Sequence, residues 1–108
     1  MTRVDTTALA EVVGQCFEHS TDGRFAPEDR ARFLVDGKRL RGLLMNLLSA
    51  QFIEGTEALV SANAAVRNVN ADLKVSADQL ARIATTLNNV ARLVGTLDRL
   101  LNVAVSFV

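Results

Sequence analysis

The strongest pattern in this sequence is a run of apolar or small residues that recur at alternating steps of three and four between Met45 and Val108. A period of 3.5 held over this length is typical of helices that lie side by side, because it keeps one seam facing a neighbour. Only one member of the run, Ser76, is polar. The run consists of Met45, Leu48, Phe52, Gly55, Leu59, Ala62, Val66, Val69, Leu73, Ser76, Leu80, Ile83, Leu87, Val90, Val94, Leu97, Leu101 and Ala104.

The polar member of the run lies where a new helix could begin. The hydroxyl of Ser76 could accept a hydrogen bond from the backbone N–H of Gln79, while Val75 packs on Leu80 as a hydrophobic staple. We therefore predict that the chain breaks between residues 72 and 76 and folds back as an antiparallel hairpin. The alternative is one uninterrupted helix of ~90 to 95 Å.

The positions that flank the seam are small or apolar rather than charged. Two-stranded coiled coils usually carry Glu and Lys there, and these charges set the partner and the register. The buried face is therefore wider than a coiled-coil seam, as in helices with more than one neighbour. The sequence predicts an all-α fold, in which an antiparallel helical hairpin and a short N-terminal helix form a four-helix bundle completed by dimerisation.

The chain has 108 residues and is expected to form a single domain, residues 1–108. It has no Trp or Tyr and one Pro, and 49% of its residues are apolar, which favours an all-helical chain. We expect an N-terminal helix and turn in residues 1–24, a long helix in residues 27–72, and a C-terminal helix in residues 76–106.

Three glycines interrupt the predicted long helix. Gly37 and Gly42 each weaken it by roughly 1 kcal/mol relative to Ala, and they could mark a kink, a close helix contact or a break near Asp36. Gly55 could end one helix, with Thr56 capping the next. Because the heptad phase runs through Gly55 unbroken, the sequence favours a continuous helix with a bend.

Charge and cysteine content limit the partners and the compartment. Twelve basic residues balance twelve acidic ones, so general attraction to nucleic acid or to acidic membranes is not expected. The single Cys fits a reducing compartment, although a cysteine-poor secreted protein would look the same. Residues 1–19 lack the apolar core of a signal peptide, and the uncharged run in residues 43–53 is about half the ~20 residues that a bilayer needs. We expect a cytoplasmic protein, with secretion as the alternative.

One triplet of residues could bind a metal ion. Cys16, His19 and Asp22 recur at three-residue steps, which could place a thiolate and an imidazole on one ion. The preferred interpretation is structural, because Cys16 belongs to the apolar face of the first helix and His19 lies near its C-terminus, where it suits the helix dipole. No motif for catalysis, for a metal or for a cofactor stands out elsewhere, so we predict no enzyme activity, no metal site and no cofactor.

Half of the positive charge lies in residues 24–41. Such a cluster could bind phosphate groups of nucleic acid. Asp29 and Asp36 interrupt it, and no set of residues is arranged to read bases, so a solvated polar face is the preferred interpretation. The candidate anion patch consists of Arg30, Arg32, Lys38, Arg39 and Arg41.

The first of three hypotheses is a non-enzymatic oligomerisation or protein–protein interaction module that forms a homodimer through the seam. The second is a secreted self-assembling or membrane-active helical protein, suggested by the scarce charges and the apolar C-terminus. The third is a small nucleic-acid-binding protein that uses residues 24–41. The predicted dimer interface consists of Leu59, Val66, Leu73, Leu80, Ile83, Leu87, Val90, Val94, Leu97 and Leu101.

Overall fold

The computed structural model describes residues 1–107 and is predominantly helical, as the composition predicted. The four α-helices are α1 (Thr6–Ser20), α2 (Pro27–Leu47), α3 (Glu57–Asp78) and α4 (Ile83–Leu100). The shorter elements are the 3-10 turns η1 (Leu80–Arg82) and η2 (Leu101–Val103) and the strands β1 (Ala50–Gln51) and β2 (Ser106–Phe107). None of the helices within residues 1–107 has both the length and the apolar character needed to cross a membrane.

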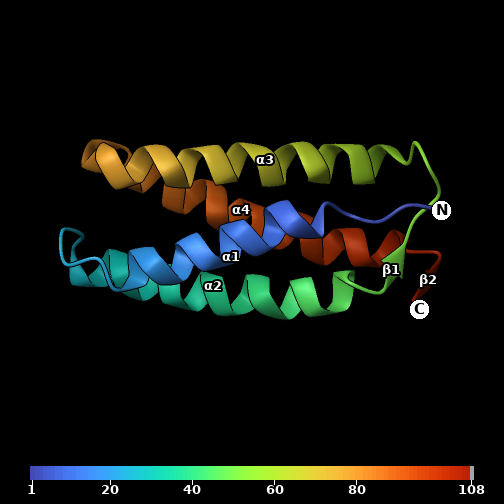
Figure 1. Ribbon diagram of the computed structural model, residues 1–108, viewed down its shortest axis with the longest axis horizontal. Helices are drawn as coiled ribbons and strands as arrows, with labels where there is room; N and C mark the ends of the chain where they lie inside the picture. Colours follow the sequence, from blue (N-terminus) through green and yellow to red (C-terminus); the bar gives the residue numbers. More distant parts are fainter. Residues whose placement is uncertain (108) are drawn as a thin grey trace.

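The helices pack as two antiparallel hairpins, α1–α2 and α3–α4, in a bundle that measures 42 × 20 × 19 Å (Figure 1). Helix α1 contacts α2 and α3, and helix α4 also contacts α2 and α3. The pairs α1/α3 and α2/α4 therefore form two opposite sides of the bundle. All four helices belong to one chain, so a second copy is not required to bring four helices together.

Local sequence signals explain where the first two helices begin. The side chain of Asp5 accepts a hydrogen bond of 3.0 Å from the backbone N–H of Ala8 and so caps α1. Pro27 occupies the first turn of α2, where its missing N–H costs nothing, and Glu28 and Asp29 place negative charge at the positive end of the helix dipole.

The core lies between the four helices and draws on all of them. Amphipathic helices of this length gain most of their stability from such packing. The largest fully buried side chains are Phe33, Phe52, Leu9, Leu40, Leu47, Leu73, Leu87, Leu93, Leu97, Val12, Val66 and Val90.

The prediction of a continuous helix through Gly55 is wrong. Helix α2 ends at Leu47, and Gly55 has a φ of +77°, which no helical residue adopts. The reason lies in Phe52, which is fully buried and whose backbone pairs with that of Thr2 through hydrogen bonds of 2.7 and 2.8 Å. This pairing holds the segment extended although the heptad phase continues through it. At Gly37, by contrast, α2 is unbroken.

The predicted hairpin is present, but its turn lies later than predicted. Ser76 does not begin a helix, because it lies inside α3 and is fully buried. Its hydroxyl forms a hydrogen bond with that of Thr86 on α4, so it has no need of a capping role. The helix ends instead at Asp78, and the φ of −126° and ψ of 87° at the next residue, Gln79, lie outside the helical region.

The predicted C-terminal helix also ends early, at Leu100. After η2 the chain extends as β2 and pairs antiparallel with β1, with Ala50 opposite Phe107 and Gln51 opposite Ser106. The segment that contains β1 thus lies between β2 and the backbone of Thr2. These short extended segments close one end of the bundle, at the right of Figure 1.

Candidate functional site

Most of the predicted dimer interface lies inside this one chain. Six of its residues belong to the core: Leu59, Val66, Leu73, Leu87, Val90 and Leu97. Ile83, Val94 and Leu101 are half-buried and pack against the core, while Leu80 is 44% exposed. The seam therefore joins helices of one chain, and most of it is not a surface that a second copy could reach while the bundle stays closed.

The thiol of Cys16 is a core group. The residue is fully buried, and this desolvation, with a smaller contribution from the nearby charge of Asp36, raises the pKa of Cys16 to about 12. Since the thiolate is the form that attacks electrophiles and binds metals, the thiol is inert at neutral pH.

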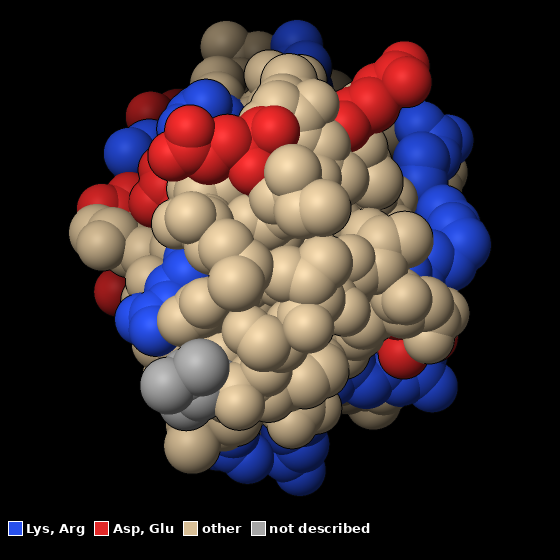
Figure 2. Space-filling view, turned by 90° about the vertical axis from the view of Figure 1, so that its right-hand side faces the viewer, with Lys and Arg blue, Asp and Glu red and all other residues tan. Residues whose placement is uncertain are grey.

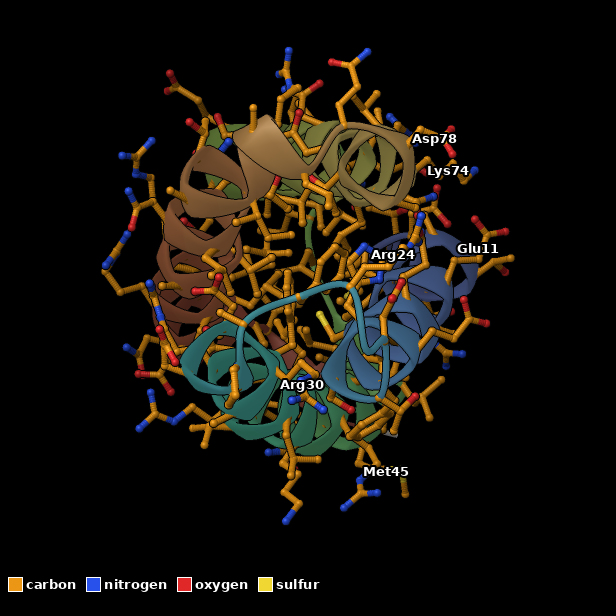
Figure 3. All side chains as sticks on the ribbon, turned by 90° about the vertical axis from the view of Figure 1, so that its left-hand side faces the viewer. Glu11, Arg24, Arg30, Met45, Lys74 and Asp78 are labelled. Atoms are coloured by element: carbon orange, nitrogen blue, oxygen red, sulfur yellow. The ribbon has the colours of Figure 1, made fainter. Side chains whose placement is uncertain are left out.

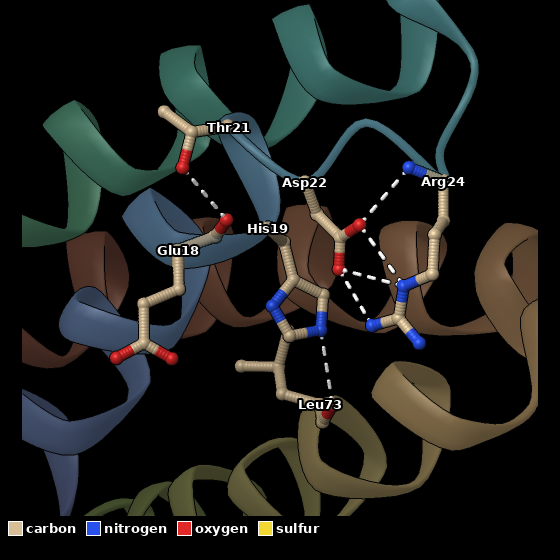
Figure 4. A network of polar contacts seen from close by, with 6 residues as sticks. All are labelled: Glu18, His19, Thr21, Asp22, Arg24 and Leu73. Atoms are coloured by element: carbon tan, nitrogen blue, oxygen red, sulfur yellow. Dashed lines mark hydrogen bonds and ion pairs between the residues drawn. The ribbon is translucent and has the colours of Figure 1, made fainter.

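The other two members of the triplet, His19 and Asp22, are held by structural contacts (Figure 4). The Nε2 atom of His19 donates to the carbonyl oxygen of Leu73 at 3.0 Å and so ties α1 to α3. Asp22 accepts hydrogen bonds from Arg24, one of them 2.6 Å long, and these bonds lower the pKa of Asp22 to about 2. No group of three possible metal ligands occurs in residues 1–107.

The imidazole of His19 is also enclosed by aromatic rings. Its centroid lies 5.2 Å from that of Phe25 and 5.0 Å from that of Phe33. These distances are typical of favourable aromatic contacts. His19 therefore acts as a core residue that fixes the loop after α1 on the end of the bundle.

The structure divides the basic segment between two sides of α2. Arg32 and Arg39 face α4 and line the α2–α4 groove, a hollow of about 360 Å³ whose other lining residues are Ala31, Val35, Asp36 and Ala91. Arg41 instead stacks over the ring of Phe17 on α1, with 5.4 Å between its guanidinium carbon and the ring centroid.

Two further members of the predicted anion patch also lie outside that groove lining. Lys38 is exposed, whereas Arg30 is half-buried and its Nε has no hydrogen-bond partner. The five residues are therefore divided among the α2–α4 groove, the contact with Phe17 and other parts of the surface of α2.

A buried carboxylate forms part of the α2–α4 groove. Asp36 is buried, and its nearest cation is Arg39, whose Nη1 lies 3.8 Å from Oδ1. Desolvation raises the pKa of Asp36, and the charges of Arg39 and Arg32 oppose the rise. Ionised Asp36 is therefore an unfavourable element of the folded state.

We expect Asp36→Asn to increase the thermal stability at pH 7. A carboxyl whose pKa is higher in the folded than in the unfolded state lowers stability as the pH rises from the unfolded pKa to the folded pKa, and by a constant amount above both. As the pH falls below ~3.9, the ordinary value for Asp, the carboxyl becomes neutral in both states and the advantage of Asn should disappear. Melting temperatures of both proteins between these pH values test this, and a lower melting temperature for the variant at pH 7 would contradict it.

The apolar surface that the sequence missed is the end of the bundle closed by the short strands. Large apolar side chains from three segments are exposed there: the N-terminus, the connection between α2 and α3, and the residues after α4. Figure 2 shows uncharged atoms across the middle of this end, with most charged groups toward its edge. We call this surface the end face. It consists of Met1, Leu48, Ile53, Val103, Val105 and Phe107.

Part of the end face could be recognised in the sequence. The apolar C-terminal tail was visible there, but its neighbours Met1 and Ile53 lie about half a chain length or more away. Only the pairing of β1 with β2 and of Phe52 with Thr2 brings them together.

Comparisons with protein-family models, with curated proteins and with solved structures found no match.

Proposed function

We propose that this protein is a non-enzymatic oligomerisation module, and that a second copy of the chain binds at the end face. The observation that carries this proposal is the set of large apolar side chains exposed together at one end, among them Ile53 at 63% and Phe107 at 58% exposure. Large contiguous apolar patches are rare on monomeric soluble proteins and usually mark interaction sites.

The chemistry of the end face suits a second copy. A two-fold dimer uses the same patch on both subunits, so the patch must be complementary to itself. An uncharged patch meets this condition without any matching of charges. The chain has equal numbers of basic and acidic residues, so two copies do not repel each other through net charge.

The open edge of the small sheet supports the same partner. Among the described residues β2 pairs only with β1, and its Phe107 belongs to the end face. Unpaired strand edges readily pair with a strand of another chain. Antiparallel pairing of β2 with its copy would obey the two-fold symmetry and cover the apolar side chains around it. Each copy would keep its own four helices in this dimer.

The double variant Ile53→Ser/Phe107→Ser tests the proposal. Both side chains are exposed in the single chain, so the fold should be retained. Full burial of one such side chain contributes about 1.5–3 kcal/mol, so we expect the dimer to weaken by roughly a hundredfold or more. Sedimentation equilibrium gives the dissociation constants, and circular dichroism checks the fold.

The matched control is Val75→Ser/Leu80→Ser, which removes two exposed apolar side chains at the opposite end of the bundle. This control should dimerise like the wild type. A wild-type protein that remains monomeric at about 100 µM would contradict the proposal, and so would unchanged dimerisation of Ile53→Ser/Phe107→Ser. Binding of the monomer to lipid vesicles would instead favour the membrane-active alternative.

A further inference from the structure

Opposite sides of the bundle carry opposite charge. Helices α2 and α4 together hold seven basic and four acidic residues, whereas α1 and α3 hold two basic and five acidic residues. Because α2 contacts α4 and α1 contacts α3, the folded chain has a basic side and an acidic side. Figure 3 looks along the bundle, with α1 and α3 at the right and top and with α2 and α4 at the bottom and left.

Each of these two sides is hollowed by a groove of similar size. The α2–α4 groove, of about 360 Å³, is lined by Arg32, Arg39 and the buried Asp36. The α1–α3 groove, of about 380 Å³, is lined by Glu11, Gly14, Gln15, Glu18 and Lys74. The α2–α4 groove thus has two positive charges and one negative charge, whereas the α1–α3 groove has two negative charges and one positive charge. The two charge patterns are complementary. Glu11 and Lys74 lie on the same side of the bundle in Figure 3.

The paired charges have the same spacing and lie near the same height along the bundle. Arg32 and Arg39 are seven residues apart on α2, as are Glu11 and Glu18 on α1, which corresponds to ~10.5 Å in a helix. Gly37 lies between the two arginines on α2, and Cys16 lies between the two glutamates on α1. A Cβ placed at Gly37 would lie 3.1 Å from the Cβ of Cys16, so these two positions are at the same height. The two pairs are therefore level to within about one helical turn.

These side chains have few ionic partners within the chain. Among the described residues Glu11, Glu18 and Arg32 form no ion pair, and Arg39 reaches only Asp36, at 3.8 Å. All four are exposed, so a partner can reach them.

We propose that the α2–α4 groove of one copy binds the α1–α3 groove of a second copy, with Arg32 opposite Glu18 and Arg39 opposite Glu11. This contact goes beyond the end face, because it uses a different surface and joins two unlike faces. A head-to-tail contact of this kind leaves one unoccupied binding face on each terminal copy, so further copies can add. The assembly grows into an open row of copies unless the rotation between neighbouring copies closes it into a ring. The end face, by contrast, closes a pair.

Neutral substitutions remove each face separately. Arg32→Gln/Arg39→Gln leaves only the acidic face, and Glu11→Gln/Glu18→Gln leaves only the basic face. Both pairs are made in the Ile53→Ser/Phe107→Ser background, so that association through the end face does not contribute. The lateral contact is then tested independently of the proposed function. All substituted side chains are exposed, and circular dichroism checks that the fold is kept.

Sedimentation velocity is measured at ionic strengths of about 0.02 M and about 0.5 M, between which screening shortens the reach of charge interactions several-fold. The background protein should form species larger than dimers at low salt, with an affinity at least about tenfold weaker at high salt. Each variant alone should remain monomeric at low salt. An equimolar mixture of the two should form a 1:1 complex and nothing larger, since each partner has only one working face.

The control variant Arg3→Gln/Arg82→Gln removes two exposed positive charges that line neither groove, and it should associate like the background protein. The proposal is overturned if the background protein is monomeric at low salt. It is also overturned if either double variant alone still associates, or if their mixture does not. A background protein that binds duplex DNA at low salt while it stays monomeric would assign the basic groove to nucleic acid instead.

Discussion

Leu87→Asp is expected to destabilise the folded protein strongly. Leu87 on α4 is completely buried in the core formed by all four helices. The substitution removes the packing of a leucine and places an unpaired carboxylate in an apolar site, where a charge is strongly disfavoured. The loss should exceed about 4 kcal/mol, against a total stability of about 5–15 kcal/mol for a typical domain. Chemical denaturation followed by circular dichroism measures it.

Leu80→Asp is the control for this prediction. Both leucines belong to the same apolar run, and the sequence assigned both to one interface. Leu80, however, lies in η1 between α3 and α4 and is 44% exposed, so its replacement should change the free energy of unfolding by less than about 1 kcal/mol. Equal destabilisation by the two substitutions would contradict the difference in burial between Leu87 and Leu80.

Gly37→Leu is expected to lower the free energy of unfolding by roughly 3 kcal/mol. Gly37 lies where α2 approaches α1 closely, since a Cβ at this position would lie 3.1 Å from the Cβ of Cys16 and 3.2 Å from the ring of Phe17. A leucine has three more carbons to place in the same gap. The two helices must therefore separate, and the contacts along their length are weakened. Thermal and urea denaturation measure the effect.

Gly42→Leu, in the same helix, provides the matched comparison. A Cβ at Gly42 meets nothing within 4 Å, and leucine is a better helix former than glycine. This variant should be as stable as the wild type or up to about 1 kcal/mol more stable. If Gly37→Leu behaves in the same way, then the contact between α1 and α2 is less close than the structure indicates.

Much of the core could be read from the residues in order. The period of the apolar residues identified Leu59, Val66, Leu73 and Leu97 as buried, because a helix brings residues three and four apart to the same face. The same pattern failed at Gly55. A heptad phase records only local spacing, and the pairing of Phe52 with Thr2, which breaks the helix, joins residues fifty positions apart.

The candidate surfaces could be predicted only in part. The apolar tail that contains Phe107 and the basic residues Arg32 and Arg39 were noted from the sequence. Their neighbours were not, because Ile53 joins Phe107 only through the small sheet. In the same way, Glu11 and Glu18 lie on the side of the bundle opposite to the two arginines only because of how the helices pack, with α1 beside α3 and α2 beside α4.

The amino-acid sequence was enough to establish that the chain is helical and which of its side chains avoid water, since both follow from interactions between residues a few positions apart. It could not show whether the apolar seam faces a second copy or the rest of its own chain, because both arrangements bury the same residues. The tertiary structure decided this by placing α1 and α4 each between α2 and α3. That placement depends on contacts between distant segments, and it fixes which charges share a side and which apolar residues remain exposed at one end.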